Sequence, residues 1–268
     1  MSKAVDCHAL FNNTHNDAPA AHWPPPEGIP DVMLNDFTMG NQITVEYGYD
    51  MVRYSGAEAK ENVWTSDYVN DMVAKAQSGT LEGTYGVTET NHVIQTIREA
   101  CMKHNQCVKS LHVMVIGSEN PWLEAVLLAE RAARITTLEY GSITSHHPQV
   151  QTMLPSELRQ KFLAGTFERF DAIATFSSVE HSGLGRYGDT LNPWGDIQAI
   201  ANAWCVAKDH APMLIGVMPG LPHDNLTWNL HRQYGKLRWT QMMANWEQIS
   251  RGYGGFQNIH VFRKKAVV

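Results

Sequence analysis

The sequence predicts an α/β fold, a doubly wound and mostly parallel sheet with helices on both faces. From Thr88 onward, short apolar runs alternate with amphipathic helical patterns, which is typical of parallel strand–helix–strand units. Residues 171–179 lack sustained polar alternation, as expected of a central strand covered on both faces. That run ends abruptly in Glu180, His181 and a glycine-rich loop. We expect the ligand site there, because open α/β sheets bind ligands beyond the carboxyl ends of their strands.

The first 85 residues are predicted to form an irregular extension packed on a Rossmann-like domain of residues 86–268. Residues 22–30 (HWPPPEGIP) are proline-dense and predict an extended arm or a linker. Residues 43–52 have the composition of a strand or of an irregular loop. A helix is expected over residues 65–77, with Ser66 as its cap and one apolar face.

The domain begins with a helix over residues 88–101 and an apolar strand over residues 111–116, which ends at Gly117. Asn120 as N-cap and Pro121 as the first helical residue predict a helix over residues 122–133. A second strand, residues 135–140, ends at Glu139 and Tyr140. No strand can be recognised in residues 141–169, which contain one predicted helix at 155–163.

The remaining elements follow the central strand. Asp196 is expected to cap a helix that runs to Cys205, and a strand follows at residues 213–218. An amphipathic helix over residues 236–249 and a strand over residues 258–263 complete the predicted domain.

Charge and hydropathy exclude some partners. The formal net charge of −6, with only short basic clusters, argues against nucleic acid and anionic membrane surfaces. No apolar run approaches the ~20 residues that span a bilayer, and residues 1–13 lack the apolar centre of a signal peptide. A cytoplasmic location follows by default. Sequons at Asn12 and Asn225 would matter only in a secretory context, and no feature predicts the oligomeric state.

The four cysteines form no CxxC pair, so neither a zinc ribbon nor a dithiol redox motif is predicted. Cys101 and Cys205 fall on apolar helical faces. Buried structural thiols are the expectation.

The central loop carries residues suited to catalysis. Glu180 and His181 form a candidate general-base pair, because a carboxylate beside a histidine can orient the ring and raise its pKa. Asp189 is a second candidate base, and Arg186 can clamp an anionic substrate. In the alternative, structural interpretation, Asp189 and Arg186 pair simply to hold the glycine loop.

A second polar loop, residues 223–234, follows the strand at 213–218 and is expected at the same edge of the sheet. Its aromatic and polar side chains suit the wall of a pocket for a sugar or other small molecule. A metal ion is an alternative ligand of these histidines and carboxylates, although no HxH or HExxH spacing supports one. The candidate substrate-binding residues of the two loops are Arg186, Tyr187, His223, Asp224, His231, Arg232 and Tyr234.

Gly117 and Glu139 have the spacing of a nucleotide-binding unit. A glutamate about twenty residues after a glycine turn can accept hydrogen bonds from ribose hydroxyls. The competing interpretation is a surface glutamate at the end of a strand.

The segments SSVEHSGLGRYGDTLNPWGD (177–196) and NLHRQYG (229–235) closely resemble a family of proteins catalogued as domain of unknown function 268. More distantly, the order of elements resembles the class I methyltransferases that use S-adenosylmethionine. The latter resemblance implies that Glu139 holds the ribose and that residues 179–181 lie beside the methyl group. The cofactor-binding residues it implies are Gly117, Ser118, Glu119, Asn120, Glu139, Tyr140 and Val179.

Three functions remain open at this stage. The first is an S-adenosylmethionine-dependent methyltransferase that acts on a hydroxyl of a small molecule or glycan. The second is a metal-assisted hydrolase or other enzyme that has lost the donor site, which the single glycine of GSENPW (117–122) favours. The third is a non-catalytic binding protein, because a fold does not fix a function.

Overall fold

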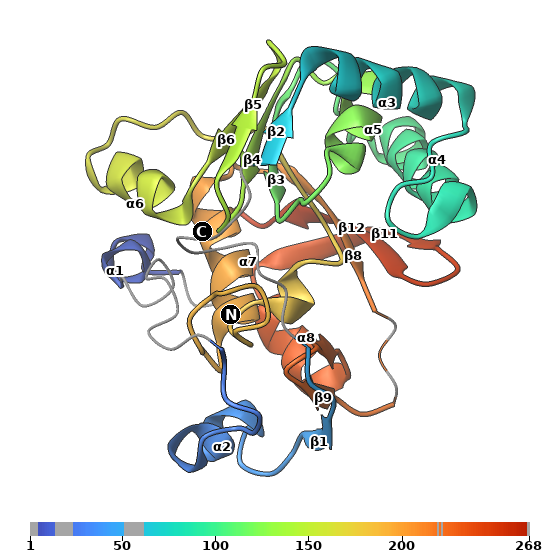
Figure 1. Ribbon diagram of the computed structural model, residues 1–268. Coiled ribbons are helices and arrows are strands. Elements are labelled where there is room, and N and C mark those ends of the chain that lie inside the picture. The colour runs from blue at the N-terminus through green and yellow to red at the C-terminus, as the bar shows by residue number, and fades with distance from the viewer. Residues whose placement is uncertain (1–4, 14–23, 51–61, 219, 221, 267–268) are drawn as a thin grey trace.

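A computed structural model describes residues 5–13, 24–50, 62–218, 220 and 222–266. Within these residues a seven-stranded sheet forms the centre, in the order β11-β12-β8-β7-β3-β4-β6 (Figure 1). β6, β4, β3, β7 and β8 are parallel, whereas β12 is antiparallel to both of its neighbours. The strands are β3 (His112–Ile116), β4 (Arg134–Leu138), β6 (Val150–Met153), β7 (Ala172–Phe176), β8 (Pro212–Val217), β11 (Trp246–Tyr253) and β12 (Asn258–Lys264).

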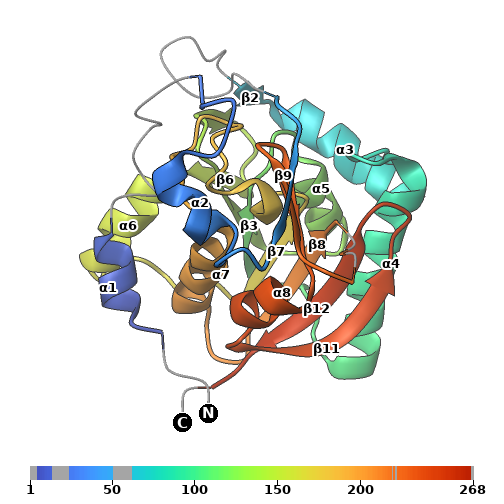
Figure 2. The same cartoon turned by 90° about the horizontal axis from the view of Figure 1, so that it is seen from below.

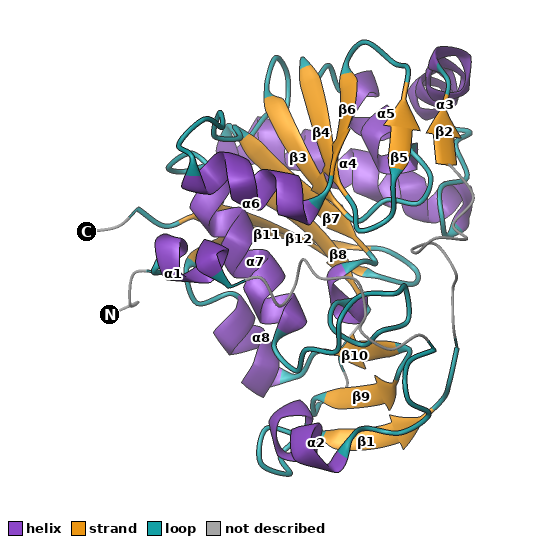
Figure 3. Cartoon of the chain, turned by 60° about the vertical axis from the view of Figure 1, so that its left-hand side comes forward, coloured by secondary structure: helices purple, strands orange, loops and turns teal. Residues whose placement is uncertain are grey.

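Helices cover both faces of the sheet (Figure 3). Alternate residues of β3 point to opposite faces: Val113 and Val115 pack in one hydrophobic core, and Met114 and Ile116 pack in another. The first core includes α3 (Ser66–Ser78), α4 (Gly86–His104) and α5 (Trp122–Ala129). The second includes α6 (Pro155–Leu163), α7 (Gly195–Val206) and α8 (Lys236–Met242). This arrangement confirms the predicted doubly wound fold.

The chain reverses its direction across the sheet between β3 and β7. It runs outward from β3 to β4 and β6, returns to β7 on the other side of β3, and continues to β8. A crevice forms at such a switch point, because the loops on either side of it lead away in opposite directions. β7 is buried along its whole length, as the central strand of the prediction requires.

Two predictions about the sheet fail for lack of a local signal. β6 supplies the strand that could not be recognised in residues 141–169; it has four residues and only Val150 is buried. The helix predicted over residues 236–249 ends at Met242, and the chain continues as β11. Pairing with β12 in an antiparallel ladder outweighs the helical periodicity of this segment.

Asp196 does not cap α7, contrary to the prediction. Trp194 occupies the N-cap position. The Asp196 side chain is instead buried and accepts hydrogen bonds from Arg238. The buried guanidinium of Arg238 therefore binds the carboxylate that the local sequence predicts as a helix cap.

Much of the N-terminal segment packs on the domain. The predicted helix at 65–77 is confirmed as α3, which Thr65 rather than Ser66 caps. β1 (Thr44–Tyr47), β9 (Asn225–Trp228) and β10 (His231–Gln233) form a small separate sheet, against which α2 (Asp31–Phe37) packs through Phe37 and Trp228 (Figure 2). β2 (Asn62–Trp64) pairs with β5 (Ile143–Ser145). Residues 22, 23, 51 and 52 of the predicted arm and strand lie outside the described residues.

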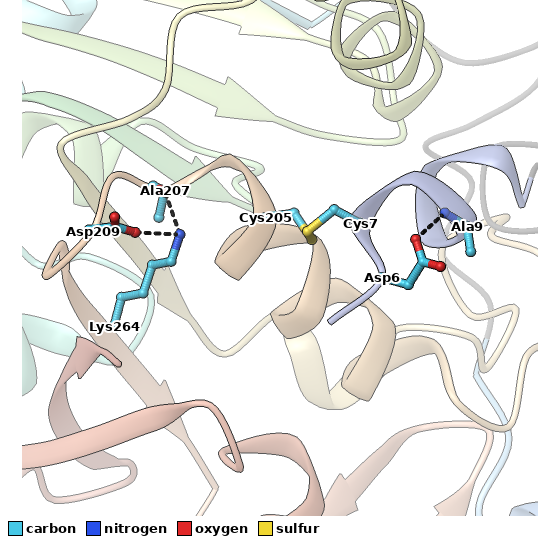
Figure 4. Close-up of a disulfide and its surroundings, with 7 residues drawn as sticks. All are labelled: Asp6, Cys7, Ala9, Cys205, Ala207, Asp209 and Lys264. Atoms are coloured by element: carbon cyan, nitrogen blue, oxygen red, sulfur yellow. Dashed lines mark hydrogen bonds and ion pairs between the residues drawn. A yellow bond between two sulfur atoms is a disulfide. The ribbon is translucent and has the colours of Figure 1, made fainter. Parts of the chain in front are cut away.

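All four cysteines are in disulfides, so the prediction of free thiols is wrong. Cys7 bridges to Cys205, and Cys101 bridges to Cys107. The first bridge ties α1 (Cys7–Asn12) to α7 across 198 residues of sequence (Figure 4). At the same, C-terminal end of α7, Lys264 Nζ donates to the carbonyl oxygen of Ala207 and lies 3.5 Å from Asp209. Among the described residues, no helix is both long and apolar enough to cross a bilayer.

Candidate functional site

A cavity of about 570 Å³ lies at the switch point, over the carboxyl ends of β3, β4 and β7. Its volume is within the usual range for small-molecule sites. One side is formed by the turns after β3 and β4, and the other by the loop after β7, by α7 and by β10. Of the candidate residues, those that line the cavity are Gly117, Ser118, Glu119, Asn120, Glu139, Tyr140, His181, Arg186, Tyr187 and His231.

The turn after β3 begins at Gly117, whose φ of +70° lies in the region that favours glycine. A Cβ at this position would overlap Ser178 Oγ, so the turn packs directly on the loop after β7. The Ser118 hydroxyl points back into the protein, where its oxygen lies 2.8 Å from the carbonyl oxygen of Asn120 and 3.0 Å from Glu124 Oε2. The contact with Ser178 and the polar contacts of the Ser118 hydroxyl therefore fix the turn. Glu119 and Asn120 line the cavity.

Glu139 joins the turns after β3 and β4. Its Oε2 accepts a hydrogen bond from the Ser118 amide at 2.9 Å, and its Oε1 accepts one from the Tyr140 amide at 2.8 Å. Burial raises the pKa of Glu139, and these amide hydrogen bonds oppose that rise. A carboxylate offers about four acceptor positions, and the backbone amides of Ser118, Tyr140 and Gly141 occupy three of them. The side chain can accordingly accept a ligand hydroxyl without breaking its own hydrogen bonds.

Sequence reasoning missed several residues of this region. Tyr85 lines the cavity and its hydroxyl lies 2.7 Å from Ser177 Oγ, but it belongs to the segment assigned to the extension. Glu124, on α5, is fully buried and accepts hydrogen bonds from Ser118 and Thr137. Burial raises the pKa of Glu124 to about 7. For Glu124, the one available sequence signal was a glutamate within an apolar helical pattern.

His181 lies on the opposite side of the cavity, in the 3-10 turn η1 (Val179–His181). Its Nδ1 lies 2.6 Å from the carbonyl oxygen of Leu230. Because a carbonyl can only accept, Nδ1 carries the proton and Nε2 is the basic nitrogen of the neutral ring. Burial lowers the pKa of His181 to about 3, and the nearby Arg186 and His231 add to the effect.

The expected pairing of Glu180 with His181 is not formed. The Leu230 carbonyl orients the ring, and the pKa of His181 is lowered rather than raised. Glu180 is fully buried and does not line the cavity. Burial raises the pKa of Glu180 to about 7, although Ser177 and the Ser178 backbone partly offset it. Val179 is likewise buried outside the cavity lining.

Asp189 holds the glycine loop, as the structural interpretation proposed, although its partners are backbone amides rather than Arg186. Its carboxylate accepts hydrogen bonds from the amides of Gly183 at 2.6 Å and Tyr187 at 3.3 Å. The side chain is buried and does not line the cavity. Asp189 therefore fixes the loop, whereas His181 faces the cavity.

Only His231 of the candidates in residues 223–234 lines the cavity. Arg232 is buried and donates to the carbonyl oxygens of Ser182 and Asn192. Asp224 accepts hydrogen bonds from the first amides of α8, Tyr234 is buried, and His223 is exposed outside the lining. In the described part of the chain, no group of three or more His, Cys, Asp and Glu residues is arranged to hold a metal ion.

Glu180→Gln is expected to remove a pH dependence of stability. The carboxyl of Glu180 keeps its proton up to about pH 7 in the folded protein but only up to its usual 4.5 when unfolded. Its stabilising contribution is therefore complete below pH 4.5 and is lost as the pH rises through 7. From pH 5 to pH 8, the unfolding free energy of the variant should rise by about 2 kcal/mol relative to wild type.

Urea unfolding of the variant and of wild type at pH 5 and pH 8 measures this difference. The histidines contribute equally to both proteins, so their contributions cancel. Glu99→Gln, on the exposed surface of α4, is the control and should give a small difference. A difference between Glu180→Gln and wild type that stays constant with pH would contradict the raised pKa.

Comparison with known proteins gives one family and several similar folds. The profile of the family described as "Caenorhabditis protein of unknown function, DUF268" matches residues 110–261, more than half of the chain. None of the curated proteins matches the sequence.

Among solved structures, Burkholderia thailandensis 1,6-didemethyltoxoflavin-N1-methyltransferase, with bound S-adenosylhomocysteine, has a TM-score of 0.46 at 12% identity, over 74% of this chain and 87% of that chain. The N-methyltransferase NodS from Bradyrhizobium japonicum WM9, in complex with S-adenosyl-L-homocysteine, has a TM-score of 0.45 at 12% identity, over 75% and 98%. A putative hemolysin from Streptococcus thermophilus has a TM-score of 0.43 at 11% identity, over 65% and 66%.

Proposed function

The chain belongs to the family described as "Caenorhabditis protein of unknown function, DUF268", a description that names no reaction, and we propose from its cavity that it is an S-adenosylmethionine-dependent methyltransferase. One observation carries the proposal. Across a single cavity at the switch point, a carboxylate bonded to the glycine turn, Glu139, faces the side that holds a neutral histidine, His181. The first suits a nucleoside, and the second suits the deprotonation of an acceptor.

The residues present fit such a donor despite the single glycine of the turn. The turn requires glycine at Gly117, where φ is positive and Ser178 is in contact. Ser118 turns its hydroxyl into the protein, so its side chain does not fill the cavity. Glu139 would accept a ribose hydroxyl. Glu119 adds negative charge to the lining, which favours a cationic group such as a sulfonium.

His181 would act on the acceptor. When bound, S-adenosylmethionine supplies an electrophilic methyl group and leaves as S-adenosylhomocysteine. As the acceptor oxygen gains the methyl group it loses its proton, which Nε2 of His181 can accept. The Leu230 carbonyl holds the ring through Nδ1 and stabilises the protonated form, because a charged donor strengthens that hydrogen bond. The proposed acceptor is therefore a hydroxyl of a small molecule or glycan.

We further propose that the chain folds in an oxidising compartment rather than in the cytoplasm that the sequence predicts by default. Both disulfides support this, because such bonds form and persist mainly in secreted proteins and in oxidising compartments. The absence of nucleic-acid and membrane partners stays a prediction from net charge and composition.

Glu139→Gln tests the donor site. Isothermal titration of the purified full chain with S-adenosylhomocysteine should show binding to wild type and a loss of about 1–3 kcal/mol in the variant, because the charged acceptor of the ribose hydroxyl is lost. The glutamine is isosteric and keeps one oxygen to accept from the Ser118 amide.

Glu99→Gln is again the matched control and should bind like wild type. A thermal melt of each variant verifies that it is folded. Failure of wild type to bind S-adenosylhomocysteine would refute the proposed function, and unchanged affinity in folded Glu139→Gln would refute the role of Glu139.

A further inference from the structure

We propose that the acceptor carries a carboxylate or phosphate group near its reactive hydroxyl, and that Arg186 binds this anion. The inference rests on the proposed function in that it calls the ligand an acceptor. The anion site itself follows from the geometry around Arg186. It adds a substrate class to the site and a specificity-determining role to one residue.

Arg186 has hydrogen-bond donors to spare. Nη2 is paired with Asp50 at 2.8 Å, and Nη1 makes only a long contact of 3.4 Å with the Leu230 carbonyl oxygen. Nε is buried and has no partner among the described residues. A guanidinium presents five N–H donors, and carboxylates and phosphates can accept two of them at once. Because Arg186 lines the cavity, an anionic ligand there could accept from the guanidinium donors that the described protein groups leave open.

The guanidinium is held in place rather than free in solvent. Its side chain is only 20% exposed, and its central carbon lies 5.2 Å from the centre of the Tyr187 ring. This stacking orients the planar fork before a ligand arrives, which reduces the entropy lost on binding. Asp50, by contrast, is 49% exposed. An incoming anion can displace a partner of this kind more cheaply than a buried one.

The charged residues of the cavity lining belong to different elements. Of the described residues that line the cavity, the carboxylates Glu119 and Glu139 belong to the turns after β3 and β4, and Arg186 is the one permanent cation. His181 and His231 also line the cavity. Both are neutral, because burial and, to a smaller extent, the charge of Arg186 lower the pKa of each. Arg186 is therefore the group of the described lining that attracts an anion, while Glu119 and Glu139 suit hydroxyls and positive charge.

Anion binding would also improve the base. Arg186 contributes to the low pKa of His181, so an anion that neutralises the guanidinium would raise that pKa. Nε2 would become more basic when the charged acceptor is bound. A neutral acceptor of the same shape would lack this effect, which provides discrimination at the chemical step as well as in binding.

The test is calorimetric and needs no methyl donor. The purified full chain is titrated with D-glucuronate, D-glucose 6-phosphate and D-glucose, which share a polyol and differ in charge. We expect at least one of the two anionic sugars to bind about tenfold or more tightly than glucose, since charge-assisted hydrogen bonds to Arg186 are added. Which of the two binds more tightly distinguishes a carboxylate from a phosphate.

Four variants assign the preference to Arg186. Arg186→Gln should abolish it, and Asp50→Asn should strengthen anion binding because the competing carboxylate is lost. Arg98→Gln is the matched control. Arg98, on α4, forms a similar ion pair with Glu130 and does not line the cavity. Arg186→Lys, which keeps the charge but not the fork, should give an intermediate affinity. Thermal melts identify any variant that fails to fold.

Equal binding of the three sugars, no binding of either anion, or an unchanged preference in folded Arg186→Gln would overturn the inference. Titration with S-adenosylhomocysteine separates it from the proposed function. If wild type fails to bind this product but still prefers anions through Arg186, the proposed donor is wrong and the anion site stands.

Discussion

Arg238→Met is expected to lower the free energy of unfolding by about 3–5 kcal/mol, because it removes one partner of a buried ion pair. Arg238 and Asp196 are 2% and 0% exposed, and they are joined by two hydrogen bonds of 2.8 and 2.6 Å. Burial alone would raise the pKa of Asp196, but Arg232 and Arg238 outweigh it and hold the pKa at about 2. In the variant, Asp196 would keep Arg232, at 3.8 Å, as its remaining ionic partner.

Urea unfolding at pH 7 measures the loss. Arg263→Met is the matched control, since Arg263 pairs with Glu247 on the exposed surface of β11 and β12 and should cost at most about 1 kcal/mol. The double variant Asp196→Asn with Arg238→Met should recover part of the stability, because no full charge is then stranded. Equal losses in Arg238→Met and Arg263→Met would show that the buried pair contributes no more than a surface one.

This pair explains why the fold could be predicted better than its interior polar contacts. The period of apolar residues reports on each element alone, so β3, β4, β7, β8 and β12 were all recognised from short runs. Asp196 and Arg238 are 42 residues apart, and Cys7 and Cys205 are 198 apart. Contacts over such distances depend on how the elements pack, and the local sequence around Asp196 is equally compatible with a helix cap.

The same distinction applies within the site. The carboxyl ends of parallel strands meet at one edge of a sheet, so sequence order alone could place Glu139 and His181 at a common cavity. It could not decide between neighbours in the loop after β7. The 3-10 turn directs Glu180 into the protein and His181 to the cavity, and backbone amides take up Asp189. Tyr85 reaches the site from a segment with no recognisable pattern.

His181→Asn is expected to reduce methyl transfer by about 100-fold or more while leaving the protein stable, because general bases typically contribute 10²–10⁴-fold. The asparagine amide can occupy the place of Nδ1 and keep donating to the Leu230 carbonyl oxygen. What is lost is Nε2, the atom proposed to take the proton. Release of S-adenosylhomocysteine with an anionic hydroxyl acceptor gives the rate, and a thermal melt gives the stability.

Two further variants distinguish a base from a structural histidine. His181→Ala leaves space in the cavity wall, so added imidazole should restore part of its rate if the ring acts as a base. His104→Asn, at the exposed end of α4, is the control and should behave as wild type. A folded His181→Asn that binds S-adenosylhomocysteine and keeps its rate would show that another acceptor, such as water, takes the proton. A large loss of stability in His181→Asn, which keeps the contact with the Leu230 carbonyl oxygen, would instead assign the ring to packing that supports the fold.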